Sequence, residues 1–151
     1  MNTEPADILL AEDNPNDALL TIRSLKQHNL ANAIVHVTDG QAAIDYLFAK
    51  GVYSERDPLD LPKVVLLDLK LPKLNGLEVL SLIRDDPRTK ILPVVVLTSS
   101  QEESDLIESY QIGANSYIVK PVEFEKFSAA IYQVGLYWLL LNKPPISGKK
   151  P

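Results

Sequence analysis

Apolar and polar positions divide the chain into two kinds of segment. Short, nearly continuous apolar runs bounded by turn residues are typical of strands in a parallel sheet. We expect five such strands, at residues 8–11, 33–37, 64–69, 94–98 and 116–120. Segments with apolar residues at helical spacing follow each run and predict five helices, beginning near residues 15, 41, 76, 101 and 122. The alternation indicates an α/β fold, a doubly wound five-stranded parallel sheet covered on both faces.

The first helix carries clear start and packing signals. Asn14 is a favoured capping residue, and Pro15 suits the first helical position, where a missing N–H costs nothing. Leu19, Ile22 and Leu25 recur at helical spacing and, with Ala18 and Leu20 beside them, predict the stripe that packs on the sheet.

Chemically active side chains lie at the carboxyl ends of four of the predicted strands. They are Glu12 and Asp13 directly after the first, Asp68 near the end of the third, Thr98 at the end of the fourth and Lys120 at the end of the fifth. Ligands of such sheets bind beyond the carboxyl ends of the strands, where the strand order reverses. The three acids suit Mg²⁺, and the lysine adds a positive charge. The pattern therefore predicts a pocket that holds Mg²⁺ and a phosphoryl group.

Composition excludes several other classes of function. The formal net charge is −5 and the body of the chain has no basic block, which argues against nucleic acid or an anionic membrane as the ligand. Cysteine is absent, so there is no disulfide framework, thiol nucleophile or thiolate metal site. No secretory signal and no apolar run long enough to span a bilayer is present, so we expect a cytoplasmic protein.

Four motifs, in this order and spacing, resemble the receiver domains of two-component response regulators, which have a flavodoxin-like fold. They read AEDNPND, LLDLKLPKLNG, VVVLTSS and SYIVKP. The resemblance implies that Asp68 is the phosphoacceptor for a sensor histidine kinase. It implies that Asp13, Asp68 and the backbone carbonyl of Lys70 bind Mg²⁺, with Glu12 acting directly or through water. Lys120 would hold the phosphoryl oxygens. Thr98 and Tyr117 match the pair of switch residues that respond to phosphorylation.

This interpretation agrees with the chemistry of the residues. A carboxylate reacts poorly with an anionic phosphate unless Mg²⁺ and an ammonium group absorb the charge on the transferring oxygens. The product is an acyl phosphate that water can remove, so we expect a phosphoacceptor that slowly loses its phosphoryl group, not an enzyme. Lys70 departs from the smaller or neutral side chain that is common in the family at that position.

Two alternatives remain open from the residues. One is a receiver-like interaction module that is never phosphorylated in the cell, against which the intact acids and Lys120 count. The other is a phosphatase with an aspartate nucleophile. Such an enzyme would have a second acid two residues after Asp68, where Lys70 stands.

The C-terminal region indicates a partner. The last helix, to about residue 141, is apolar all round in Leu136–Leu141, so one face can pack on the sheet and another needs a second partner. We expect a homodimer in which outward-facing members of a set of four apolar residues make the contact: Leu136, Tyr137, Leu139 and Leu140.

The ending GLYWLLLNKPP and the loop VYSERDPLDLPK also resemble the stand-alone response regulators of cyanobacterial phytochromes. This likeness implies a phytochrome as the kinase. We expect a single receiver domain at residues 1–143 and a flexible tail at 144–151. Output would then pass through protein contacts alone.

Overall fold

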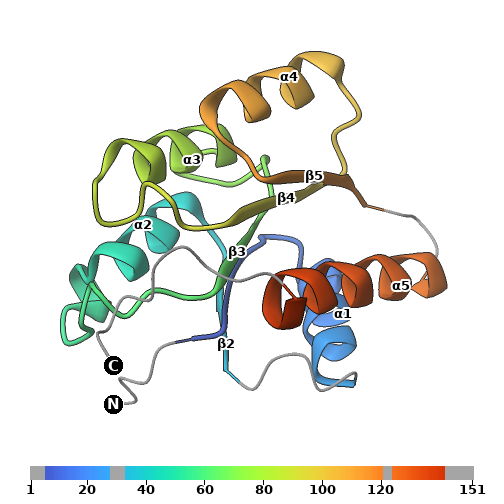
Figure 1. Ribbon diagram of the computed structural model, residues 1–151, viewed down its shortest axis with the longest axis horizontal. Helices are drawn as coiled ribbons and strands as arrows, with labels where there is room; N and C mark the ends of the chain where they lie inside the picture. The colour runs from blue at the N-terminus through green and yellow to red at the C-terminus, as the bar shows by residue number, and fades with distance from the viewer. Residues whose placement is uncertain (1–5, 28–32, 121–123, 142–151) are drawn as a thin grey trace.

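The protein is built around one parallel sheet, shown in Figure 1. The computed structural model describes residues 6–27, 33–120 and 124–141. The strands are β1 (Ile8–Ala11), β2 (Ile34–Val37), β3 (Val64–Leu67), β4 (Val94–Thr98) and β5 (Ser116–Val119). Their order in the sheet is β2-β1-β3-β4-β5, and every neighbouring pair is parallel. The predicted fold class is confirmed.

The order of the strands reverses at β1. The chain passes from β1 to β2 on one side and then crosses back to β3 on the other, so β1 and β3 are direct neighbours. Their last residues, Ala11 and Leu67, are partners in the register. The residues that follow these two strands therefore emerge side by side, at the reversal point where sheets of this type bind ligands.

In the part of the chain that the structure describes, five α-helices cover the two faces of the sheet. They are α1 (Pro15–Gln27), α2 (Gly40–Phe48), α3 (Gly76–Asp85), α4 (Glu103–Ile112) and α5 (Phe124–Gly135). Helix α1 packs against α5, whereas α2 packs against α3 and α3 against α4. Figure 1 shows the α1–α5 pair on one side of the sheet and the other three helices on the opposite side.

The sheet separates two hydrophobic cores. Successive side chains of a strand point to opposite faces. Leu9 and Val65 accordingly belong to the core under α2 and α3, whereas Leu10 and Leu66 belong to the core under α1 and α5. Both faces of each central strand are thus buried, which explains why these strands read as continuous apolar runs.

Side-chain caps start the helices next to the reversal point. Asn14 Oδ1 accepts a hydrogen bond of 3.1 Å from the backbone N–H of Asp17 and so caps α1. Asn75 and Glu78 exchange two hydrogen bonds at the start of α3, each side chain accepting from the other's backbone N–H. These caps set the path of the chain as it leaves β1 and approaches α3.

The predicted inner face of α1 is partly wrong. Leu19 is 54% exposed, whereas Ala18, Thr21 and Leu25 are buried. Thr21 is tolerated inside because its hydroxyl donates a hydrogen bond of 2.8 Å to the backbone carbonyl of Asp17. Leu20 and Ile22 are half-buried and pack against the core under α1 and α5, so within the predicted stripe only Leu19 faces away from the sheet.

The C-terminal helix also differs from its prediction. After α5 the chain continues as a π-helical segment, η2 (Leu136–Leu141), and the change falls next to Gly135, a poor helix former. Leu139 is only 8% exposed and belongs to the core under α1 and α5, so it is not one of the outward-facing members of the predicted set of four. Tyr137 is 50% exposed. The proposed tail, 144–151, lies outside the described residues.

Within the described part of the chain, the helices are too short or too polar to cross a membrane.

Candidate functional site

Three carboxylates meet at the carboxyl ends of β1 and β3. Glu12 and Asp13 follow β1 directly, Asp68 follows β3, and one oxygen of each lies within 4.8 Å of the others. Glu12 is 1% exposed and Asp68 is 5% exposed, whereas Asp13 is open to solvent. Carboxylate oxygens at this spacing, one of them reachable from water, suit a hard divalent cation that keeps part of its hydration shell.

Lys120 joins this cluster from the end of β5. Its Nζ lies 2.5 Å from Oε1 of Glu12 and 3.0 Å from Oδ2 of Asp68. The side chain of Lys120 is only 7% exposed. A buried ammonium group is tolerated when carboxylates surround it, and here it offsets part of the repulsion among the acids.

The environment separates the pKa values of the two buried acids. The pKa of Glu12 is raised from 4.5 to about 7, because burial and the charge of Asp68 together exceed the opposing effect of Lys120. Burial is the largest single influence on the pKa of Asp68 and acts to raise it, but the charge of Lys120 acts in the opposite direction. Hydrogen bonds to Asp68, including one from Thr98, add to this effect, and its pKa is lowered from 3.8. Asp68 is therefore the acid held most firmly as a carboxylate, the form that can act as a nucleophile.

The backbone around Asp68 is closely packed. The N–H of Lys70 donates a hydrogen bond of 3.3 Å to Oδ1 of Asp68, while the N–H of Gly76 donates one of 2.8 Å to the carbonyl of Leu69. A Cβ at Gly76 would lie 2.3 Å from the carbonyl oxygen of Asp68. The start of α3 thus presses directly on the chain that carries this carboxylate. The predicted role of the Lys70 carbonyl in metal binding stays a prediction.

Thr98 and Tyr117 both contact the loop between β4 and α4. Thr98 is fully buried, and its Oγ1 accepts a hydrogen bond of 3.3 Å from the N–H of Ser100. The hydroxyl of Tyr117 donates one of 3.0 Å to the carbonyl of the same serine. Ser100 is therefore the residue through which the two predicted switch side chains meet, a link that the sequence analysis did not include.

The sequence analysis also missed one acid of the site. Asp17, in the first turn of α1, places Oδ2 3.0 Å from Nζ of Lys120. The signal available was its spacing: it stands four residues after Asp13, one helical turn beyond the cap of α1. Acids are common in the first turn of any helix, so this signal was weak.

Fold and site together define an α/β protein whose sheet carries an acidic pocket, suited to a divalent cation, beside a buried lysine. The chain belongs to the response regulator receiver domain family, whose sequence profile matches residues 8–132. It is thus a receiver protein of two-component signalling.

Individual relatives match nearly the whole chain. FilR2, a probable methanogenesis regulatory protein of Methanothrix harundinacea, is 41% identical over 142 residues, which cover 94% of this chain and 89% of FilR2. The phosphorylated cyanobacterial phytochrome response regulator RcpA is 35% identical with a TM-score of 0.87, covering 94% of this chain and 99% of RcpA. The Mn²⁺-bound form of Rcp1, a response regulator of Synechocystis, is 35% identical with a TM-score of 0.86, covering 94% of this chain and 100% of Rcp1. The predicted likeness to cyanobacterial phytochrome response regulators is confirmed.

Proposed function

We propose that Asp68 accepts a phosphoryl group from a sensor histidine kinase in a reaction that requires Mg²⁺. The observation that carries this proposal is the position of Lys120, whose Nζ lies 3.0 Å from Oδ2 of Asp68 beside the cluster of three carboxylates. An ammonium group at that distance can stabilise the negative charge on the phosphoryl oxygens while the group passes from the donor to Asp68.

In the proposed reaction, an oxygen of Asp68 attacks the phosphorus of a phosphohistidine. The P–N bond breaks, and the departing imidazole nitrogen keeps the bonding electron pair. Lys120 holds the phosphoryl oxygens, and the hydroxyl of Thr98 turns toward them from the end of β4. A bound Mg²⁺, held by Asp13, Asp68 and the carbonyl of Lys70 with Glu12 in support, supplies further positive charge. The crystal structure of Mn²⁺-bound Rcp1 supports a divalent ion in this type of protein.

The product is an acyl phosphate, which reacts with water. We therefore infer a phosphoacceptor that slowly dephosphorylates itself and turns over no other substrate. Tyr117 provides the readout: its hydrogen bond to Ser100 couples β5 to the loop that follows Thr98. A movement of that loop toward the phosphoryl group would change the orientation of the Tyr117 side chain and the shape of the protein surface next to it.

Phosphotransfer from a purified kinase tests this proposal. The kinase is first labelled with radioactive ATP and then mixed with the receiver and Mg²⁺. Rapid transfer of label to the receiver supports the proposal, with a phytochrome kinase as the first candidate because of the likeness to RcpA. No labelling by any kinase or by acetyl phosphate would favour the interaction module instead. Hydrolysis of simple phosphomonoesters would favour the phosphatase alternative.

Removal of Asp13 is expected to abolish stabilisation by Mg²⁺. An ion that binds only the folded pocket stabilises it by about 1.4 kcal/mol at ten times its Kd. That gain would raise the melting temperature by about 3–5 °C in a chain of this size. Asp13→Ala should lose this shift, and because Asp13 is exposed the variant should otherwise fold as the parent does. Thermal melting with and without Mg²⁺ measures both effects, with Asp85→Asn at the far end of α3 as the control. A full Mg²⁺-dependent shift in Asp13→Ala would contradict the ligand assignment.

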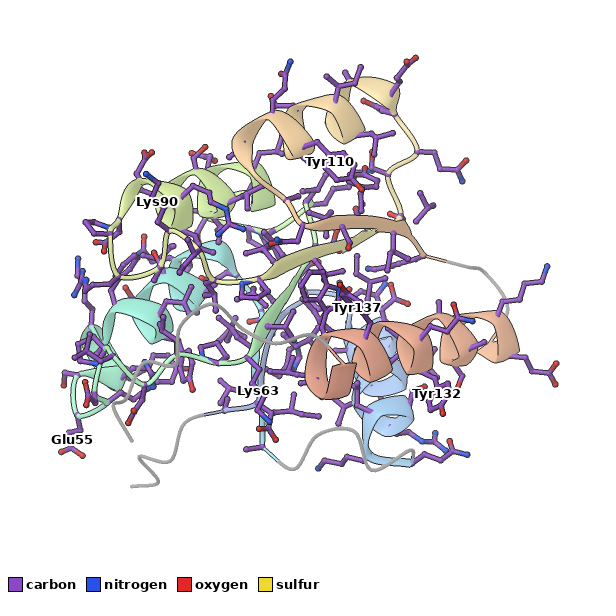
Figure 2. All side chains as sticks on the ribbon, in the orientation of Figure 1. Glu55, Lys63, Lys90, Tyr110, Tyr132 and Tyr137 are labelled. Carbon is purple, nitrogen blue, oxygen red and sulfur yellow. The ribbon has the colours of Figure 1, made fainter. Side chains whose placement is uncertain are left out.

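We further propose that the protein forms a homodimer through its C-terminal helical segment. Figure 2 shows Tyr132 and Tyr137 on this segment, and they are 38% and 50% exposed. The Tyr137 ring packs edge-on against the ring of Trp138, with the ring centres 5.0 Å apart. The exposed tyrosine is therefore held in place by a half-buried tryptophan. Exposed aromatic side chains held in this way are frequent anchors of protein interfaces.

Tyr137→Glu is expected to weaken the dimer more than tenfold. Loss of an aromatic anchor costs on the order of 2 kcal/mol or more, and each 1.4 kcal/mol corresponds to about a factor of ten in Kd. Analytical ultracentrifugation across micromolar concentrations measures the change. Val52→Glu, a substitution at a side chain that is 77% exposed outside this segment, is the matched control. A monomeric parent, with or without an acyl-phosphate mimic, would end the proposal.

The remaining parts of the proposal concern context. We place the function in the cytoplasm, where a histidine kinase obtains its ATP. We assign residues 1–143 to one receiver domain, whose output is a change in protein contacts.

A further inference from the structure

A carboxylate outside the acid cluster also touches the active-site lysine. Asp17 Oδ2 lies 3.0 Å from Nζ of Lys120, and the side chain of Asp17 is 29% exposed. The main chain of Asp17 is held at both ends, since its N–H donates to Oδ1 of Asn14 and its carbonyl accepts from the hydroxyl of Thr21. The carboxylate therefore approaches Lys120 from a fixed helical turn.

The three contacts of Lys120 use its whole donor capacity. An ammonium group has three N–H donors and no acceptor. Carboxylate oxygens of Glu12, Asp68 and Asp17 lie 2.5, 3.0 and 3.0 Å from Nζ, in that order. A phosphoryl oxygen on Asp68 can gain an N–H of Lys120 only if one of these acids gives it up.

Asp17 is the partner that can leave at the smallest cost. The side chains of Glu12 and Asp68 are 1% and 6% exposed, so either would lose an ion pair in a nearly dry environment. Asp17 already reaches solvent, and water can replace the lysine at its carboxylate.

The charge of Asp17 also acts on an incoming phosphoryl donor. A donor must bring its negative oxygens close to Lys120, and a carboxylate 3.0 Å from Nζ both repels these oxygens and competes for the same ammonium group. Because Asp17 is partly exposed, salt should weaken this repulsion.

We propose that Asp17 is a displaceable counter-ion of Lys120, which orients the lysine in the unphosphorylated protein and opposes phosphorylation until a phosphoryl oxygen takes its place. Asp17 is thus a positioning residue that sets the donor concentration the protein needs. The inference rests on the proposed phosphoacceptor function of Asp68.

Asp17→Asn tests this role. Asparagine keeps the size of the side chain and one acceptor oxygen but removes the charge. With a small anionic donor such as acetyl phosphate at saturating Mg²⁺, we expect the donor concentration for half-maximal labelling to fall about threefold or more at low ionic strength. The difference should shrink at about 0.5 M salt, where exposed charges are screened. A small donor is used because α1 could also contact a kinase.

Two further variants separate charge from structure. Asp17→Glu keeps the charge and should retain the salt dependence of the parent. Asp85→Asn removes the same charge at the far end of α3 and should leave the half-maximal concentration unchanged. Melting curves show whether each variant folds, and Asp17→Ser replaces Asp17→Asn if the latter does not.

The results distinguish this inference from the proposed function. If the parent is labelled at Asp68 but Asp17→Asn needs as much donor as the parent at both salt concentrations, or more, the counter-ion role is wrong and the phosphoacceptor function stands. If the parent itself is not labelled, both the phosphoacceptor function of Asp68 and the counter-ion role of Asp17 are wrong.

Discussion

Asp68→Asn is expected to abolish labelling by acetyl phosphate and by a histidine kinase while leaving the fold intact. The amide has no carboxylate oxygen to attack phosphorus, and the neighbouring acids cannot replace it. Both Oε1 and Oε2 of Glu12 are engaged, with Lys120 and with the N–H of Asn14, and burial favours its protonated form. The measurement is incorporation of radioactive phosphate, with the fold checked by circular dichroism.

Retention of the fold is expected because asparagine can keep part of the contacts of Asp68. Its amide oxygen can still accept from the N–H of Lys70, or from Nζ of Lys120. Lys70→Ala serves as a control at an exposed neighbour and should remain labelled. Labelling of Asp68→Asn at the level of the parent would move the acceptor to another residue and overturn the assignment.

Gly76→Ala is expected to cost about 2 kcal/mol or more of stability, through overlap with the chain that carries the acceptor. The new Cβ would lie 2.3 Å from the carbonyl oxygen of Asp68 and 2.6 Å from Cα of Leu69, and backbone atoms cannot turn aside as a flexible side chain can. Either α3 or the end of β3 must move. A loss of that size lowers the melting temperature by about 4–8 °C.

Gly51→Ala is the matched control for the added methyl group. Gly51 has a φ of +58°, but a Cβ there would come no closer than 3.5 Å to a neighbouring atom, the carboxylate of Asp45. The Gly51→Ala variant should lose only about 1 kcal/mol of stability, because alanine is strained at this positive φ. Equal losses in the two variants would show that close approach of α3 is not what requires glycine at position 76. If the displaced segment is β3, Gly76→Ala should also slow labelling of Asp68, and Gly51→Ala should not.

The fold and the acid cluster could be predicted because both follow from local patterns. The central strands are buried on both faces and so appear as unbroken apolar runs, and capping residues such as Asn14 and Asn75 mark where helices begin. Once the strands are known to be parallel, their carboxyl ends must share one edge. This geometry alone brings Glu12 and Asp68 together.

The pairing of charges within the site could not be predicted in the same way. Asp17 and Lys120 are 103 residues apart, and their contact depends on how α1 leaves β1 and how β5 ends. No residue type distinguishes Asp17 from the many acids that merely favour the start of a helix.

Helix orientation was a second source of error. One residue corresponds to about 100° around a helix axis, so a pattern displaced by one position exchanges an inner residue for an outer one. Leu19 was assigned to the interior and is exposed, while Leu139, one of four residues whose facing was left open, is buried. In both places several apolar residues stand in a row, and the pattern alone does not select among them.

The two separate cores have a consequence for how such a protein can diverge in evolution. Among the described residues, the buried side chains under α1 and α5 form a cluster separate from those under α2 and α3, because each strand residue points to one face alone. Substitutions in the two cores should therefore have nearly additive effects on folding free energy. One layer of helices can then acquire new surface chemistry for a new partner without compensating changes in the other. The acids of the site follow β1 and β3, and these strands pack against both layers of helices. Substitutions in either core can therefore affect the position of these acids.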